Sequence, residues 1–102
     1  MDRRKLAKLR RLLEALRRGQ PKARELQSLA RQLGRKPAKN RGKEPMWEST
    51  EFDELFVLAI PNHKGRDMAP VTINKILNQL EGDISAWEER LLEDEDGPAA
   101  KT

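Results

Sequence analysis

Residues 55–80 of the chain have the sequence LFVLAIPNHKGRDMAPVTINKILNQL and decide which fold class the chain can adopt. The six apolar, β-prone residues 55–60 end at Pro61, and this pattern is typical of a short strand. A polar loop over residues 61–70 follows, and apolar residues then recur at helical spacing over residues 71–80. A strand, a loop and an amphipathic helix in this order predict a domain in which helices pack on a sheet.

Two further helices are expected upstream of this stretch, over residues 3–18 and 22–33. In each of them apolar residues recur every three or four positions, and a glycine follows the last of them. The apolar stripe of the first helix consists of leucines: Leu6, Leu9, Leu12, Leu13 and Leu16. We interpret this stripe as core or as a contact between helices, because it lacks the aromatic anchor expected of a helix that lies on a membrane.

The segments between the second helix and residue 55 predict further strands. Residues 46–50 form a strand candidate, and residues 51–54 suit a turn. Residues 35–43 are basic and contain Pro37 and Gly42, so they are either a loop or a poor edge strand.

The C-terminal part is expected to contain two short helices and a tail. The helix over residues 71–80 is expected to stop at Gly82. A last helix over residues 85–92 is indicated by the capping-box spacing of Ser85 and Glu88. Residues 93–102 begin with an acidic run and continue with glycine and proline, so we expect a disordered tail there.

Charge is divided very unevenly along the 102 residues, although the net charge is only +4. Residues 1–43 contain 16 Lys and Arg and three acids, which gives +13, whereas residues 44–102 contain 5 Lys and Arg and 14 acids, which gives −9. A basic surface of this kind attracts polyanions and accelerates their capture. The basic half therefore predicts a contact with nucleic acid. There are two alternatives to a contact with nucleic acid. The basic residues form only a solvated surface, or the acidic half of the chain neutralises them.

Composition excludes several other kinds of function. The chain has no cysteine, so disulfides, thiolate metal sites and cysteine nucleophiles are excluded, and a reducing, cytoplasmic location is expected. No apolar run approaches the ~20 residues that span a bilayer, so no membrane partner is expected. His63 is the only histidine, and the carboxylates lack the spacing of a metal site, so we expect no metal and no cofactor.

Residues 22–84 resemble the HicA family, the RNA-cleaving toxins of bacterial toxin–antitoxin systems, in their order of helix, basic segment, two strands, Pro-x-His loop and helix. The clearest local similarity covers Ile60, Pro61, Asn62, His63, Gly65, Asp67, Met68, Thr72, Ile73, Ile76 and Leu77. The resemblance implies an α+β fold related to the double-stranded RNA-binding domain, with a small three-stranded antiparallel sheet in the order α-β-β-β-α. An extra N-terminal amphipathic helix and a C-terminal helix would be added to it.

On this basis the chain divides into four parts. These are a basic helical extension (residues 1–20), a HicA-like domain (residues 21–84), the C-terminal helix (residues 85–92) and the acidic tail (residues 93–102).

The resemblance implies RNA cleavage, but the family's catalytic motif is not retained. Where the family has Gly-Ser-His-His, this chain has Gly42, Lys43, Glu44 and Pro45, so Glu44 stands at the position of the catalytic histidine. The pair that these residues offer is Glu44 as base with His63 as acid. Neighbouring lysines and arginines would lower the pKa of Glu44, because they favour its charged form. This argues against Glu44 as the base of a catalytic pair. An exposed loop acid and an ordinary loop histidine are the alternatives.

Binding of RNA requires less than cleavage, since Lys and Arg neutralise phosphates and shape contributes much of the recognition of a duplex. The candidate binding residues lie beside the expected sheet and after His63: Arg35, Lys36, Lys39, Arg41, Lys43, Trp47, Lys64 and Arg66. Of these, Trp47 either stacks on a base or packs in the core.

The sequence thus favours an RNA-binding, HicA-like protein of a toxin–antitoxin system in which cleavage is weak or lost, with an antitoxin protein as a further partner. An active endoribonuclease, that is, an mRNA interferase, is one alternative. The other is a protein-interaction module without a nucleic-acid role, whose N-terminal helix docks a partner or forms a homodimer.

Overall fold

The computed structural model describes residues 1–38, 46–61 and 68–100, with side chains up to residue 94. The elements follow the order α1 (Arg3–Arg18), α2 (Ala23–Gln32), β1 (Arg35–Pro37), β2 (Met46–Ser49), β3 (Leu58–Ala59) and α3 (Pro70–Ala100). The strands form an antiparallel sheet in the order β1-β2-β3. This arrangement confirms the predicted α+β class, with a three-stranded antiparallel sheet and helices before and after it.

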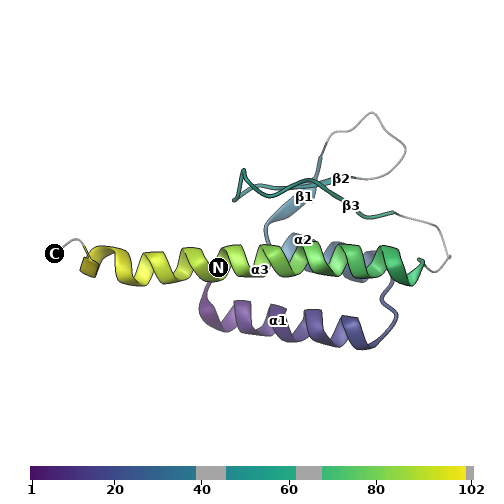
Figure 1. Ribbon diagram of the computed structural model, residues 1–102, viewed down its shortest axis with the longest axis horizontal. Helices are drawn as coiled ribbons and strands as arrows, with labels where there is room; N and C mark the ends of the chain where they lie inside the picture. The colour runs from purple at the N-terminus through teal and green to yellow at the C-terminus, as the bar shows by residue number, and fades with distance from the viewer. Residues whose placement is uncertain (39–45, 62–67, 101–102) are drawn as a thin grey trace.

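The elements are arranged in layers around α3, which runs along the longest dimension of the molecule (Figure 1). α1 lies along one side of α3, and the sheet lies on the other side. α2 contacts α1, α3 and β1, so it links these layers. Buried side chains from the helices and the sheet form one hydrophobic core. Residues 1–20, which the sequence suggested as an extension, contribute to that core.

α1 and α3 pack as antiparallel helices along apolar stripes of the same spacing. The buried residues of α1 follow the three-and-four spacing of a coiled coil: Leu6, Leu9, Leu13 and Leu16. Five buried residues of α3 have the same spacing: Ile73, Leu77, Leu80, Ile84 and Trp87. Ile76 and Asp83 are buried beside them. Leu12, the remaining leucine of the predicted stripe, is only partly buried. The apolar stripe of α1 is therefore buried against other elements of the same chain, mainly α3.

Both N-terminal helices begin and end close to the predicted residues. Asp2 caps α1, because its Oδ1 accepts a hydrogen bond of 2.7 Å from Lys5 N, and this bond lowers the pKa of Asp2. After α2, Gly34 has a φ of 97°, in the left-handed region that favours glycine. Gly34 O accepts hydrogen bonds from Thr50 N and Oγ1, so the chain turns directly from α2 into the sheet.

The strand predicted over residues 55–60 is shorter in the structure. Only Leu58 and Ala59 form β3, which pairs with the start of β2. Phe56 O accepts a hydrogen bond from the Arg35 side chain, so this carbonyl bonds to a guanidinium instead of a neighbouring strand. The prediction of a six-residue strand was therefore wrong. β1 corresponds to the poor edge strand that was one interpretation of the basic segment.

The C-terminal part forms one helix where the sequence predicted two. α3 runs through Gly82 to Ala100, so residues 93–100 are helical instead of forming the expected disordered tail. A glycine in a helix costs only about 1 kcal/mol relative to alanine. Leu80 and Ile84, on either side of Gly82, are fully buried and stabilise the helix there. Tertiary packing therefore overrides the local stop signal.

Candidate nucleic-acid interface

Seven of the ten predicted site residues lie outside the described residues. They are Lys39, Arg41, Lys43 and Glu44 in residues 39–45, and His63, Lys64 and Arg66 in residues 62–67. The catalytic pair of Glu44 and His63 therefore stays a prediction from the sequence. Arg35, Lys36 and Trp47 are described, and the structure assigns a distinct environment to each of them.

Arg35, the first residue of β1, lies in the interior with 4% of its surface exposed. Its Nε and Nη2 donate to the two carboxylate oxygens of Asp83 in α3, at 2.6 and 2.8 Å. Its Nη1 donates to the backbone carbonyls of Trp47 and Phe56, both at 3.0 Å. A guanidinium held in this way cannot reach a phosphate. The structure thus gives Arg35 a structural role in place of the predicted RNA contact.

Asp83, the partner of Arg35, is buried as deeply, with 1% of its surface exposed. Burial raises the pKa of the Asp83 carboxyl, because the charged form loses its hydration. The hydrogen bonds and the positive charge of Arg35 oppose this rise. The pair joins α3 to β1 and, through the two carbonyls that Arg35 binds, to the rest of the sheet.

Trp47 of β2 is also buried, with 2% of its surface exposed. The Arg31 guanidinium of α2 lies 4.9 Å from the centre of the Trp47 ring, in a cation–π contact. The indole therefore packs in the hydrophobic core, and its faces are not open to a nucleotide base. Of the two interpretations of Trp47, the core position is the one that the structure shows.

Lys36 of β1 is exposed, and it alone among the described members of the predicted set lies on accessible surface. Its register partner across the sheet is Glu48 of β2. An acid opposite a lysine offsets part of its charge. The described part of the sheet therefore presents little net positive charge to a polyanion.

A larger basic surface lies on α1, and the predicted set of binding residues did not include it. Three pairs of adjacent arginines repeat every seven residues: Arg3-Arg4, Arg10-Arg11 and Arg17-Arg18. Seven residues are close to two helical turns, so the first members of the pairs share one face and the second members share the next. This heptad repeat is the signal in the sequence from which the surface could have been predicted.

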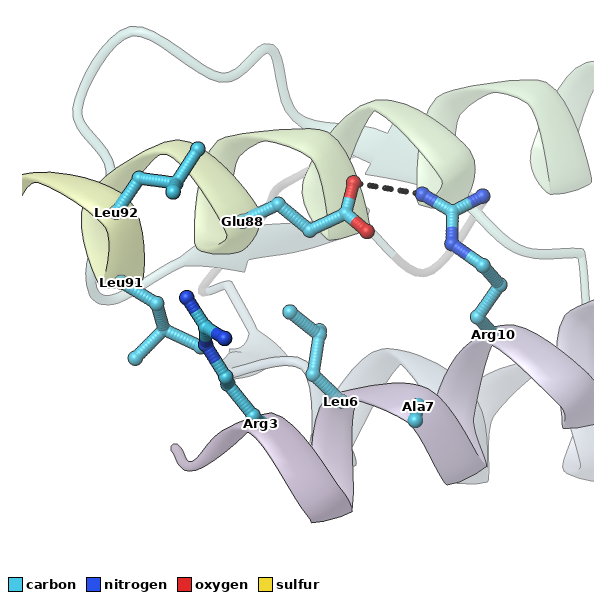
Figure 2. A pocket seen from close by; sticks show the side chains of 7 residues that line it. All are labelled: Arg3, Leu6, Ala7, Arg10, Glu88, Leu91 and Leu92. Carbon is cyan, nitrogen blue, oxygen red and sulfur yellow. Dashed lines mark hydrogen bonds and ion pairs between the residues drawn. The ribbon is translucent and has the colours of Figure 1, made fainter.

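The first members of these pairs lie toward α3. Arg10 Nη2 donates to Glu88 Oε1 at 2.7 Å (Figure 2). Arg17 Nη2 donates to Glu81 Oε1 at 3.0 Å and to Asn78 Oδ1 at 2.9 Å. These contacts set the antiparallel register of the two helices and neutralise the charges of Arg10 and Arg17.

The second members lie on the side of α1 opposite the buried leucines. Arg4, Arg11 and Arg18 are exposed, and Lys8 is exposed on the same side. Lys8, Arg11 and Arg18 make no hydrogen bond or ion pair within the described residues. We call Arg4, Lys8, Arg11 and Arg18 the outer basic face. Figure 1 places this helix on the side of α3 away from the sheet.

Metal coordination finds no support in the described residues, where no three His, Asp or Glu side chains come together in a way that would hold a metal ion. None of the helices in the described ranges has an apolar stretch long enough to cross a membrane.

The chemistry that the outer basic face offers is the binding of anions by guanidinium and ammonium groups. Comparison of the chain with protein-family models, with curated proteins and with solved structures finds no match.

Proposed function

We propose that the protein binds nucleic acid, with RNA as its main partner, through the outer basic face of α1. The observation that carries this proposal is the difference between two rows of arginines on one helix. Arg10 and Arg17 are paired with acids of α3, whereas Arg11 and Arg18 are exposed and form no ion pair within the described residues. Packing of α1 on α3 does not require the second row.

The geometry of α1 suits a polyphosphate better than a single anion. Arg4, Arg11 and Arg18 are seven residues apart, which is ~10.5 Å along the axis of a helix. The ion pairs of Arg10 and Arg17 fix α1 on α3, so the outer row is held in place before a ligand binds. Each phosphate that the row neutralises releases counterions, and the resulting affinity depends steeply on salt.

The HicA-like interpretation is part of this proposal. The order α2, β1, β2, β3 and α3 is the order that the resemblance implies, and folds related to the double-stranded RNA-binding domain recognise duplex RNA largely by shape. The protein then acts in the cytoplasm within a toxin–antitoxin pair, with weak or absent cleavage and with an antitoxin protein as its second partner. The departure from the family's motif at Glu44 supports the loss of cleavage.

Binding of a duplex RNA at several salt concentrations, measured by fluorescence anisotropy, tests the role of the outer basic face. The slope of log K against log salt falls by ~0.9 for each phosphate contact that is lost. Replacement of both Lys8 and Arg18 with glutamine should therefore reduce the slope by about 2. The control is the same loss of charge at Arg24 and Lys75, which are exposed on α2 and α3. If the two variants have equal slopes, the outer basic face is not the interface.

Incubation of the same RNA with the wild-type protein, His63→Ala and Glu44→Ala separates binding from cleavage. We expect the RNA to stay intact with all three proteins, because the family's catalytic motif is missing here. Cleavage that either substitution abolishes would instead establish the endoribonuclease alternative.

The interaction-module alternative has less support from the described residues. This alternative requires the leucines of α1 to contact a partner. Four of them are instead buried in the protein's own core: Leu6, Leu9, Leu13 and Leu16. A protein partner or a second copy would have to bind another face of the chain.

A further inference from the structure

A polar pocket lies where the N-terminal end of α1, the C-terminal end of α2 and the turn after β2 meet. It has a volume of about 400 Å³, and its lining is mainly polar. The residues that line it come from these segments and from α3: Met1, Lys5, Arg31, Gln32, Gly34, Thr50, Glu51 and Trp87. No residue of the outer basic face is among them, so the polar pocket is a separate site.

Arg31 of α2 brings a set of unused hydrogen-bond donors to the polar pocket, and their position is fixed. Its guanidinium lies over the Trp47 ring, 4.9 Å from the ring centre, and Trp47 is itself held in the core. Stacking uses the face of a guanidinium and leaves the N–H groups, which lie in its plane, available. The Arg31 side chain makes no hydrogen bond or ion pair within the described residues.

Lys5 of α1 provides a second positive charge at the polar pocket. Its side chain is exposed, and its ammonium group makes no hydrogen bond or ion pair in the part of the chain that the structure describes. Lys5 and Arg31 belong to different helices, so the two charges reach the pocket from different sides. Two cations that converge in this way can bind one anion with charge-assisted hydrogen bonds.

The groups of the polar pocket that would repel an anion already have partners. Glu51 is the one acid among the residues that line it, and Glu51 Oε1 lies 3.9 Å from Arg90 Nη1. The backbone oxygens at the end of α2 and in the turn after it accept hydrogen bonds: those of Arg31, Leu33 and Gly34. A pocket with unused donors and occupied acceptors favours an anion over a cation.

We propose that the polar pocket is a phosphate-binding site in which Arg31 and Lys5 hold the oxyanion. The volume exceeds that of a bare phosphate, so the site takes a phosphate group that belongs to a larger molecule. A phosphodiester of a nucleic acid and a small phosphorylated metabolite share this chemistry. The proposal does not depend on binding of RNA by the outer basic face.

Titration of the full chain with inorganic phosphate at constant ionic strength, followed by ¹⁵N–¹H NMR, tests the site. We expect saturable shifts of the Gly34 amide and the Gln32 side chain, with a dissociation constant of about 1–10 mM. Arg31→Gln and Lys5→Gln should each raise this constant at least about fivefold, because each removes a charged donor. The matched control is Arg24→Gln, which changes an exposed arginine of α2 outside the pocket and should leave the constant unchanged.

Three results would overturn the proposal. They are the absence of saturation up to about 50 mM phosphate, the same shifts with chloride, and an Arg24→Gln variant that loses as much affinity as Arg31→Gln. Circular dichroism melts establish that each variant is folded. Lys5→Gln repeats the test without disturbing the contact between Arg31 and Trp47.

The salt dependence of binding to duplex RNA identifies the source of the phosphate. If a phosphodiester of the RNA occupies the polar pocket, Arg31→Gln lowers the slope of log K against log salt by ~0.9. If the slope is unchanged while inorganic phosphate still binds the wild type, the site belongs to a small phosphorylated molecule. Both results support a phosphate site. Failure of the outer basic face is detected separately, with the Lys8 and Arg18 double variant.

Discussion

Arg35 and Asp83 form the one ion pair in the described ranges in which both side chains are almost inaccessible to water, with 2% and 1% exposed. Removal of one partner leaves the other charge buried without compensation, which costs about 3–5 kcal/mol. We therefore expect Asp83→Leu to lower the free energy of unfolding by that amount in urea denaturation. Adding Arg35→Met should restore about 2 kcal/mol or more, because no uncompensated charge is left. A cost below about 1 kcal/mol for Asp83→Leu would contradict this account.

At the scale of single residues, the sequence predicted charge better than it predicted exposure. Arg35 and Lys36 are adjacent basic residues, yet one is buried and the other is exposed. The difference depends on Asp83, which is 48 positions away along the chain, and no local pattern contains that information. The arginine pairs of α1 are the opposite case, because the heptad repeat that separates their two rows is visible in the sequence.

At the scale of elements, helices with a clear apolar period were predicted to within one or two residues, as α1 and α2 show. β3 was overestimated, because the six apolar residues around it do not reveal that β2 offers a partner for only two of them. The break in α3 was predicted from Gly82, whose local preference is weaker than the packing of its neighbours. Local signals therefore failed where distant contacts decide the outcome.

Gly82, inside α3, and Gly34, just after α2, should respond to alanine in opposite directions. Gly82 lies inside α3, and a Cβ there would meet nothing within 4 Å, so Gly82→Ala should raise the free energy of unfolding by about 1 kcal/mol. Gly34 has a φ of 97°, and its Cβ would lie 3.3 Å from Glu51 Cγ. Gly34→Ala should therefore lower the free energy of unfolding by about 1–2 kcal/mol. Thermal melts of the two variants check this, and shifts of the same sign would be inconsistent with it.

At the scale of the whole molecule, α1 provides both the outer basic face and part of the core. Each buried leucine contributes about 1.5–3 kcal/mol, so the four in α1 contribute an amount comparable with the ~5–15 kcal/mol stability of a small domain. Deletion of residues 1–20 should therefore abolish cooperative unfolding in circular dichroism melts. The double replacement of Lys8 and Arg18 with glutamine should melt like the wild type. A truncated chain with a cooperative melt near the wild-type temperature would show that α1 is dispensable for folding.

The pairing of α1 with α3 also determines when this protein can fold during its synthesis. Arg10 and Glu88 are 78 positions apart, so α1 leaves the ribosome well before the helix that covers its leucines. At ~5–20 residues per second, the interval is about 4–16 s. The nascent chain exposes its apolar stripe and its full positive charge together for that time, close to ribosomal RNA. A chaperone that shields α1 during translation should raise the yield of folded protein.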